Sequence, residues 1–221
     1  MTIFLDLDGT LLDVSSRYYA VYRDLLNEFD LTGLSRDEYW AAKRKKISEE
    51  RILSLTGAQK CFELYRKRWL VLIEHPDYLN LDGPQAGAVQ TLEKIAEINR
   101  PVLVTLRKSR PNLWRQLSDF GLLDYFSEII NSSAADDIGP AKLRLLEKYL
   151  TRTRQKGHVL VTDTDGDILA GKRLGCLTIA VWNGMRTREL LIEARPDHLI
   201  GSIGDLFDLP IDFSLLSRES P

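Results

Sequence analysis

Short apolar runs recur along this 221-residue chain, and a polar residue follows most of them. This pattern limits the fold of the chain more than any other feature. The runs occupy residues 3–5, 102–104, 129–130, 159–161 and 177–181, and the residues that follow them are Asp6, Thr105, Asn131, Thr162 and Trp182. Segments with apolar residues at helical spacing separate them, at 89–96, 113–120, 143–150 and 168–169. Buried parallel strands joined by crossover helices have this pattern. It predicts an α/β fold with a doubly wound parallel sheet.

A long insertion interrupts this alternation between the first two runs. Residues 15–81 carry apolar side chains at helical spacing, as in 18–29 and 61–73, and no convincing strand. An insertion of about 65 residues is too long for an ordinary crossover, and a turn at residues 82–84 marks its end. We therefore expect a core domain over residues 1–14 and 82–221 and an all-helical cap domain over residues 15–81.

Composition excludes several classes of partner. Thirty Lys and Arg against 32 Asp and Glu leave a net charge of −2, so the whole-protein field attracts neither nucleic acid nor an anionic membrane. No stretch has the length of a membrane span or a signal peptide. Cys61 and Cys176 lie far apart, which suggests neither a disulfide framework nor a cysteine zinc site. We expect a cytoplasmic monomer or homodimer that binds no nucleic acid and no membrane.

Candidate functional residues follow the predicted strands. Ligands of doubly wound sheets bind beyond the carboxyl ends of the strands, so the residues at those ends should meet. This edge would gather four carboxylates, a hydroxyl and an ammonium group, from Asp6, Asp8, Asp163, Asp167, Thr105 and Lys142.

Such a cluster suits phosphoryl transfer. Four neighbouring carboxylates repel one another unless a cation joins them, and an all-oxygen ligand set suits Mg²⁺. Lys142 would cancel part of the remaining charge. Thr105 and the backbone N–H groups of Leu106 and Arg107 would donate to phosphoryl oxygens. Mg²⁺ would then shield a carboxylate nucleophile from the phosphate and stabilise charge during transfer.

Four segments, in order, resemble the signatures of the haloacid dehalogenase (HAD) superfamily, in its phosphatase branch. The first is Asp6-Leu7-Asp8-Gly9-Thr10-Leu11-Leu12-Asp13, after the first apolar run. The others are Val102-Leu103-Val104-Thr105, Gly139-Pro140-Ala141-Lys142 and Val161-Thr162-Asp163-Thr164-Asp165-Gly166-Asp167-Ile168. The helical insertion resembles the cap of phosphoglycolate-phosphatase-like members. The resemblance spans nearly the whole chain and implies a HAD-like, Rossmann-type core.

The resemblance also implies roles for individual residues. Asp6 would be the nucleophile that forms an aspartyl-phosphate, and Asp8 the general acid and base. Thr105, Leu106 and Lys142 would bind the phosphate. The metal would be held by Asp6, the Asp8 carbonyl and Asp163, with Asp167 either binding it through water or orienting Lys142. The chain departs from the family at Thr162, where Gly or an acid is usual.

The implied activity is that of a Mg²⁺-dependent phosphatase acting on a small phosphorylated metabolite, such as phosphoglycolate, a nucleotide or a sugar phosphate. Three alternatives stay open. A phosphomutase of the same fold would use the same Asp6 and Asp8 but return the phosphate to its substrate. A binding protein without activity could keep the fold. A two-component receiver domain also combines acids, a Thr and a Lys, but carries no large helical insertion.

Other conspicuous residues have simpler interpretations. The basic run at residues 43–46 is typical of a solvated helix face, although Arg17 and either Arg44 or Lys45 are the basic cap residues to test first for substrate specificity. Trp40 and Trp69 are expected in the cap core. A calcium loop beginning at Asp163 is excluded because Ile168 and Leu174 occupy the positions that need Gly and Glu.

Overall fold

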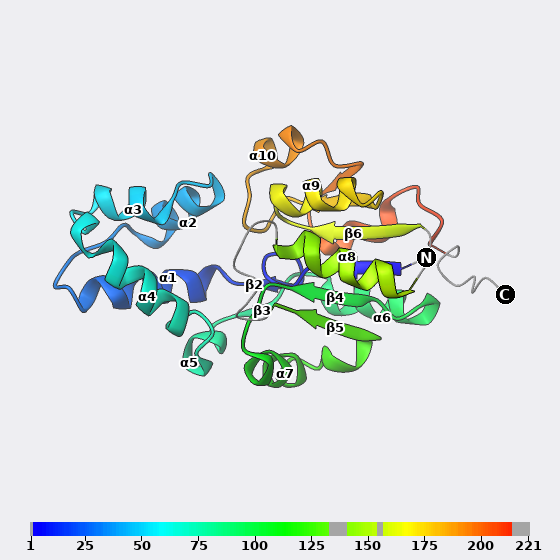
Figure 1. The fold of residues 1–221 in the computed structure, drawn as a ribbon, viewed down its shortest axis with the longest axis horizontal. Coiled ribbons are helices and arrows are strands. Elements are labelled where there is room, and N and C mark those ends of the chain that lie inside the picture. The colour runs from blue at the N-terminus through cyan, green and yellow to red at the C-terminus, as the bar shows by residue number, and fades with distance from the viewer. Residues whose placement is uncertain (1, 133–140, 154–156, 214–221) are drawn as a thin grey trace. The chain divides into compact units, whose positions relative to one another are not determined.

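A computed structural model describes residues 2–132, 141–153 and 157–213 of the chain. The chain separates into two compact units, one of Met1–Leu12 with Pro84–Pro221 and the other of Asp13–Gly83. Figure 1 shows the fold, coloured along the chain. Two short strands, β2 (Leu12–Asp13) and β3 (Gly83–Pro84), pair where the chain passes between the units. The role of the smaller unit as a cap stays a prediction.

The larger unit is built on a six-stranded sheet with the order β5-β4-β1-β6-β7-β8. All neighbouring strands in it are parallel. The strands are β1 Thr2–Leu5, β4 Val102–Thr105, β5 Glu128–Asn131, β6 His158–Thr162, β7 Leu177–Val181 and β8 His198–Ile200. Each of the five expected strands is present, which confirms the α/β prediction. Because β1 lies between β4 and β6, the residues after these three strands share one edge of the sheet.

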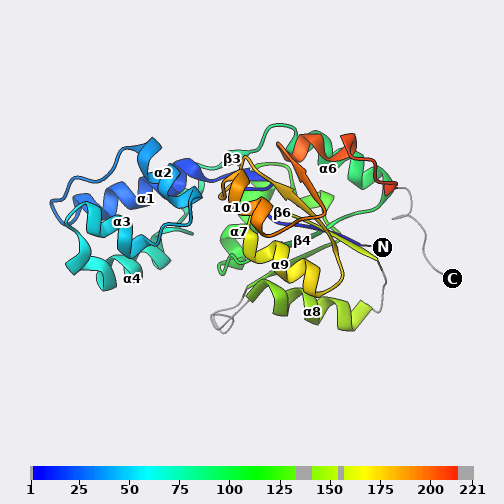
Figure 2. The same cartoon turned by 90° about the horizontal axis from the view of Figure 1, so that it is seen from above.

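Helices cover both faces of this sheet. They are α6 Ala88–Ile98, α7 Arg110–Asp119, α8 Ala141–Thr153, α9 Asp165–Arg173 and α10 Arg188–Glu193, with 3₁₀ turns at Leu123–Tyr125 and Ile203–Asp208. Figure 2 shows α8 and α9 on one side of the sheet and α6 on the other. Parallel sheets need this cover, because both of their faces are apolar.

The core beneath α8 shows how the sequence places these layers. Phe4 on β1 and Val104 on β4 are fully buried and pack with Leu146 and Tyr149 of α8. The rings of Phe4 and Tyr149 meet edge to face, with centroids 5.2 Å apart. This packing anchors α8 against the centre of the sheet, and Lys142 stands in the first turn of the helix.

The apolar pattern does not predict β8. The strand has three residues and follows Pro196 and Asp197, so it is too short for alternation to distinguish it from a loop. Pairing with β7, in which Ile179 lies beside His198, provides the context that the local sequence lacks. Gly139 and Pro140 of the expected third signature lie outside the described residues.

The smaller unit is helical in the part between its two short strands. Its elements are α1 Ser15–Asn27, α2 Arg36–Arg44, α3 Glu49–Leu55, a 3₁₀ turn at Gln59–Cys61, α4 Phe62–Leu72 and α5 Pro76–Leu79. Tyr22 and Tyr39 stack in its core at 4.2 Å, and Trp69 packs against the same cluster. Trp40 lies edge-on to Tyr18, with ring centroids 6.1 Å apart.

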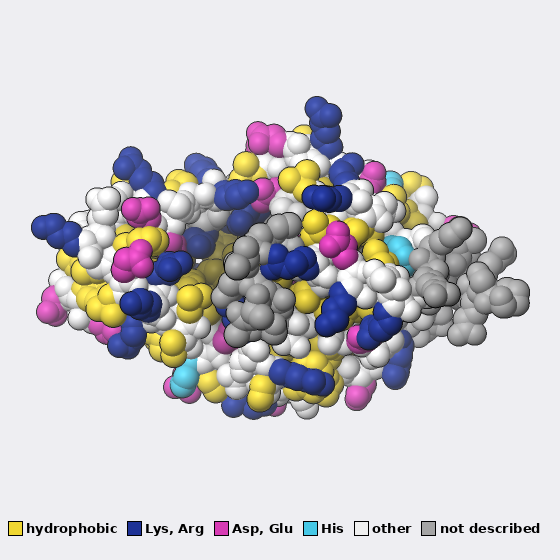
Figure 3. Space-filling model, viewed as in Figure 1, with side chains coloured by type: hydrophobic (Ala, Val, Ile, Leu, Met, Phe, Trp, Pro, Cys, Tyr) yellow, Lys and Arg dark blue, Asp and Glu magenta, His cyan; other side chains and the backbone are white. Residues whose placement is uncertain are grey.

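Charged side chains of both signs are present on one face of the protein (Figure 3). On the face shown in Figure 3, Lys and Arg side chains are dispersed among Asp and Glu side chains, which agrees with a net charge of −2. None of the described helices is long and apolar enough to cross a membrane.

Candidate active site

Lys142 joins two carboxylates at the carboxyl edge of the sheet. Its Nζ atom lies 2.7 Å from Asp6 Oδ1 and 2.6 Å from Asp167 Oδ2. All three residues are buried, with 5%, 5% and 8% of their surface exposed for Lys142, Asp6 and Asp167. Burial alone would lower the pKa of Lys142, but the attraction of Asp167 and Asp6 outweighs it and raises the pKa above the ordinary value. Lys142 is therefore a permanent cation at this edge.

Asp6 is held in one orientation. Its Oδ1 accepts hydrogen bonds from the Leu7 N–H at 2.8 Å and from Lys142. Its Oδ2 has a longer contact of 3.4 Å with the Thr162 hydroxyl. Burial, supported by repulsion from Asp167 and Asp8, raises the pKa of Asp6 to about 6 against the opposing attraction of Lys142. The two oxygens are thus unequal, and Oδ2 is the less constrained one.

Asp163, directly after β6, is fully buried beside this pair. Its Oδ2 accepts a hydrogen bond of 2.6 Å from the Met185 N–H, while its Oδ1 is buried and has no hydrogen-bond partner among the described residues. Burial and then repulsion from Asp6 raise the pKa of Asp163 well above its ordinary value. An ionised Asp163 therefore needs a cation at Oδ1.

Two glycines allow the chain to pass close to Asp163. Gly9 has a φ of +86°, and a Cβ on either Gly9 or Gly184 would overlap Asp163 Oδ2. Gly9 belongs to the predicted first signature, whereas nothing in the sequence linked Gly184 and Met185 to the site. The loop after β7 thus donates a backbone hydrogen bond to Asp163, and its backbone at Gly184 packs closely against the Asp163 side chain.

The donor set fits a divalent cation. When all four are ionised, Asp6, Asp8, Asp163 and Asp167 carry four negative charges, and the two cations that contact them, Lys142 and Arg107, offset two. Among the described residues, no three or more His, Cys, Asp or Glu side chains are grouped so that they could hold a metal ion. A site here would combine two carboxylates with a backbone carbonyl and water, which is a typical Mg²⁺ environment.

Thr162 takes part in this network rather than only filling space. It is fully buried, and its hydroxyl donates to Asp167 Oδ2 at 3.0 Å. Asp167 Oδ2 therefore accepts from both Thr162 and Lys142. Of the two roles expected for Asp167, this geometry favours the orientation of Lys142.

Asp8 has a partner that the sequence did not reveal. Arg107 grips its carboxylate with two hydrogen bonds, from Nε to Oδ2 at 2.6 Å and from Nη2 to Oδ1 at 2.7 Å. Arg107 stands two residues beyond the end of β4. That position is the available signal, because it lies at the same edge as the acids, but the sequence alone predicts only a backbone role for Arg107.

The expectation of a free Arg107 N–H group is wrong. This group donates to Thr105 Oγ1 at 3.3 Å, because the turn after β4 folds back on the strand end. Thr105 is buried, and its hydroxyl hydrogen is still available to a ligand. Leu106 has a side chain that is largely exposed, so its contribution to an anion site would come from its backbone N–H group.

Of the residues selected for substrate specificity, Arg17 has structural partners within the smaller unit. Arg17 is 1% exposed, pairs with Asp82 at 3.1 Å and donates to the Ile73 carbonyl. Lys43, in the basic run, pairs with Glu49 at 3.4 Å. Arg17 therefore has a stabilising role within this unit.

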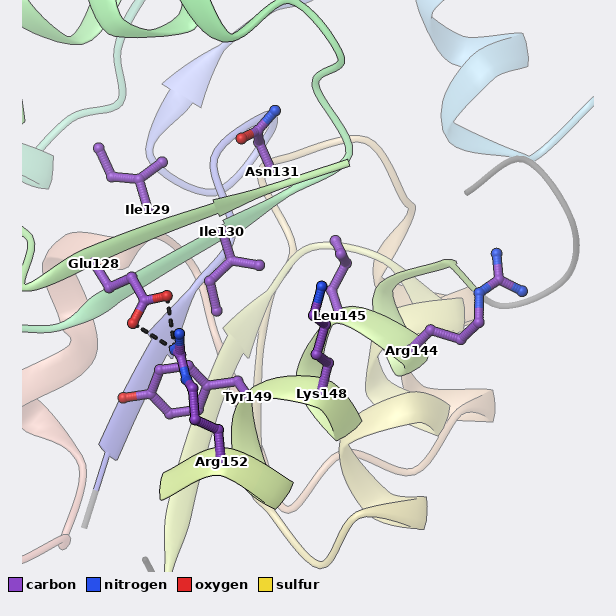
Figure 4. Close-up of a pocket in the computed structure, with 9 residues that line it drawn as sticks. All are labelled: Glu128, Ile129, Ile130, Asn131, Arg144, Leu145, Lys148, Tyr149 and Arg152. Carbon is purple, nitrogen blue, oxygen red and sulfur yellow. Dashed lines mark hydrogen bonds and ion pairs between the residues drawn. The ribbon is translucent and has the colours of Figure 1, made fainter. Parts of the chain in front are cut away.

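A separate cavity of about 380 Å³ lies beside the edge strand β5. Figure 4 shows it between β5 and α8, with an ion pair at 2.7 Å between Arg152 and Glu128 at one end. None of the predicted site residues lines this cavity. The carboxylate cluster and the cavity are thus different features of the larger unit.

Comparison with known proteins gives consistent matches over nearly the full length. The family model of haloacid dehalogenase-like hydrolases matches residues 3–181. Pyrophosphatase PpaX of Halalkalibacterium halodurans is 25% identical over 216 residues, covering 94% of this chain and 95% of that protein. Phosphoglycolate phosphatase of Neisseria meningitidis is 25% identical over 215 residues, covering 93% and 92% of the two chains.

Solved structures share the fold. A haloacid dehalogenase-like hydrolase from Streptococcus pneumoniae aligns with a TM-score of 0.74 and 16% identity, covering 94% of this chain and 96% of that one. A protein from Thermotoga maritima, named as a candidate β-phosphoglucomutase, aligns with a TM-score of 0.69 and 18% identity, covering 94% and 97%. At these identities the likeness concerns the fold alone.

Proposed function

Because the chain belongs to the haloacid dehalogenase-like hydrolases, we propose that it is a phosphatase that transfers a phosphoryl group from a small metabolite to Asp6 and then to water. The observation that carries this proposal is the position of Asp6, which is buried, bound at Oδ1 by Lys142 and by the Leu7 N–H, and less constrained at Oδ2. A carboxylate oriented in this way is prepared to act as a nucleophile.

The first step would form a bond between one Asp6 oxygen and phosphorus while the ester P–O bond breaks. Asp8 would donate a proton to the departing oxygen, so that the product leaves as an alcohol. Lys142 and the donors at Thr105 and Leu106 would hold the phosphoryl oxygens and offset their charge.

The second step would return the enzyme to its starting state. Asp8, now ionised, would take a proton from a water molecule as that water attacks phosphorus. The bond between phosphorus and Asp6 then breaks and releases orthophosphate. Splitting one hard displacement into two easier steps is the advantage of covalent catalysis.

Mg²⁺ would be held by the Asp6 and Asp163 carboxylates and by the Asp8 carbonyl, with Asp167 keeping Lys142 in place. When bound, it would supply positive charge to the phosphoryl oxygens. The buried Oδ1 of Asp163, which has no hydrogen-bond partner in the part of the chain that the structure describes, supports this assignment. Ionisation of Asp6 and Asp163 together would otherwise place two negative charges in a buried site.

The proposed substrate is a small phosphorylated metabolite. Two relatives are named for phosphoglycolate and pyrophosphate hydrolysis, which supports a compact substrate without identifying it. We assign substrate selection to the helical unit Asp13–Gly83 as its proposed cap role. Free thiols at Cys61 and Cys176 support the cytoplasm as the proposed location.

A screen of phosphate esters tests the proposal. We expect the wild-type protein to release orthophosphate from at least one ester, to require Mg²⁺, and to lose activity in Asp6→Asn and Asp8→Asn. Glu128→Gln makes the same kind of acid-to-amide change at the exposed pair with Arg152, away from the cluster, and should keep wild-type activity.

Two outcomes would overturn the proposal. A wild-type protein inert toward every ester, or Asp6→Asn as active as wild type, would exclude Asp6 as the nucleophile of a phosphatase. Conversion of a sugar phosphate to its isomer without release of orthophosphate would identify a phosphomutase instead.

A further inference from the structure

The contact between Arg107 and Asp8 is the strongest feature of the site that the proposed reaction does not use. Both carboxylate oxygens of Asp8 accept from Arg107, at 2.6 and 2.7 Å, in the two-pronged geometry that a guanidinium group forms with a carboxylate. Lysine cannot reproduce this contact, because an ammonium group offers a point charge instead of a planar fork. The contact therefore depends on arginine in particular.

Arg107 is anchored from both directions along its backbone. Its N–H group donates to Thr105 Oγ1 at 3.3 Å, and its carbonyl accepts from Asn131 Nδ2 at 3.3 Å. Thr105 and Asn131 are the last residues of β4 and β5. The side chain of Arg107 is 4% exposed, so its guanidinium group is a fixed point attached to the sheet.

Asp8 is more exposed than Arg107. It lies in the turn between β1 and β2, just before Gly9, and 20% of its side chain is exposed. A carboxyl group in such a place would rotate between several positions in water. The fork of Arg107 restricts that rotation by binding both oxygens at once.

The fork also determines which side of the carboxyl group can exchange a proton. An ionised carboxylate has about four acceptor sites, and a two-pronged arginine takes one on each oxygen. The remaining sites point away from Arg107. Proton transfer between Asp8 and a bound ester or water is thereby confined to that opposite side.

We propose that Arg107 is the positioning residue for Asp8, holding its carboxyl group so that it meets the departing oxygen of the substrate. This inference rests on the proposed function of Asp8. Arg107 acts through Asp8 and needs no contact with the reacting atoms. Its loss should therefore affect substrates in proportion to their need for a proton on the leaving oxygen.

A comparison of two leaving groups tests this inference. In Arg107→Met, we expect kcat/KM, which reports the first step, to fall by about 10- to 100-fold for an alkyl phosphate, because alkoxide departure needs general acid help. For 4-nitrophenyl phosphate, whose phenolate departs without a proton, we expect less than about a threefold fall. The second step is the same for both substrates, so the two values of kcat/KM carry the comparison.

Further variants separate positioning from a structural role. Within one variant, the ratio of the rate with the alkyl phosphate to the rate with 4-nitrophenyl phosphate does not depend on the fraction of the protein that is folded. Arg107→Lys, which keeps the charge but not the fork, should restore only part of the alkyl phosphate rate. In the Asp8→Asn background, Arg107→Met should cause little additional loss, because residues that act as a unit are not additive.

The exposed pair of Arg152 and Glu128 offers a matched control in the same unit. Arg152→Met removes an arginine from a carboxylate contact of 2.7 Å without touching the acid cluster, and should leave both rates unchanged. Equal losses for the two substrates in Arg107→Met, or additive losses in the double variant, would overturn the inference while the phosphatase proposal stands. An inert wild-type protein would instead overturn the proposed function.

Discussion

The Lys142 ammonium group lies 2.6 Å from the Asp167 carboxylate, and the two side chains come from the first turns of the contacting helices α8 and α9. A cation in the first turn of a helix is opposed by the helix dipole, whereas an anion there is favoured. The attraction of Asp167 therefore offsets the unfavourable interaction between Lys142 and the dipole of α8. It also holds Lys142 where its ammonium group can reach Asp6.

Asp167→Asn should lower kcat by about 10- to 100-fold, the usual cost of losing a supporting contact around a charged site. Lys142 would lose one of its two carboxylate partners and its fixed direction toward Asp6. Steady-state kinetics on any ester that the wild type hydrolyses would measure the effect. Asp165→Asn removes a carboxylate from the same helical turn, where it pairs with Arg186, and should change kcat far less. Equal losses would contradict the assigned role of Asp167.

Gly9→Ala should abolish most of the activity. Its methyl group would overlap Asp163 Oδ2, at a backbone φ of +86° that alanine already disfavours. Gly121→Ala is the matched control, because Gly121 also has a positive φ, of +65°, but an added Cβ there meets nothing within 4 Å. Both variants should lose thermal stability from backbone strain, and Gly9→Ala should lose more because its methyl group also overlaps the buried Asp163, with loss of Mg²⁺ binding in addition. Unimpaired Mg²⁺ binding in Gly9→Ala would argue against Asp163 as a ligand.

Stabilisation by Mg²⁺ should depend on pH. Burial raises the pKa of Asp6 from 3.8 to about 6, so the metal-free folded protein retains a proton that the unfolded chain releases between these values. The contribution of Asp6 to stability therefore falls as the pH rises through this window. Because a metal competes with protons for its ligands, the rise in melting temperature on adding Mg²⁺ should be larger at about pH 8 than at about pH 5.

Calorimetric or fluorescence melting curves with Mg²⁺ and with a chelator would measure this difference. Asp163→Asn should remove most of the Mg²⁺ effect at both pH values. A rise in melting temperature that is the same at both pH values would show that the cation binds outside these carboxylates.

Arg17→Met should destabilise the smaller unit by about 3–5 kcal/mol, the typical cost of removing one partner of a buried ion pair. Arg17 and Asp82 have side chains with 1% and 0% exposure, so the remaining carboxylate would be left in the interior. Urea unfolding of the full chain would measure the loss. The double variant Arg17→Met/Asp82→Asn should lose less than the two single losses added together. A stable Arg17→Met with a raised KM would instead return Arg17 to the role of a substrate-binding residue.

Much of the fold could be predicted because buried strands carry a local signal. The runs at 3–5, 102–104 and 159–161 are continuous and apolar, and each is followed by a residue of the candidate site. Parallel strands in one sheet direct those residues to one edge regardless of their distance along the chain. The proximity of Asp6 and Asp163 was therefore predictable from order alone, whereas the three residues of β8 had too short a pattern.

The contacts that orient these groups were not predictable in the same way. The Met185 N–H group binds Asp163, yet a backbone donor has no signature in the sequence. Thr162 looked like a departure from the family pattern, and its hydroxyl proved to donate to Asp167. Arg107 has a long side chain whose direction depends on the packing of the turn after β4.

The amino-acid sequence by itself determined the alternating α/β architecture, the place of the helical insertion and the set of acids at the strand ends. It could do so because the spacing of apolar residues and the order of the segments are properties of the chain that need no knowledge of tertiary contacts. Tertiary structure alone decided that Arg107 binds Asp8, that Lys142 lies between Asp6 and Asp167, and that one oxygen of Asp163 receives no hydrogen bond from the described residues. These contacts join residues that are distant in sequence, and a few tenths of an ångström determine whether each hydrogen bond forms.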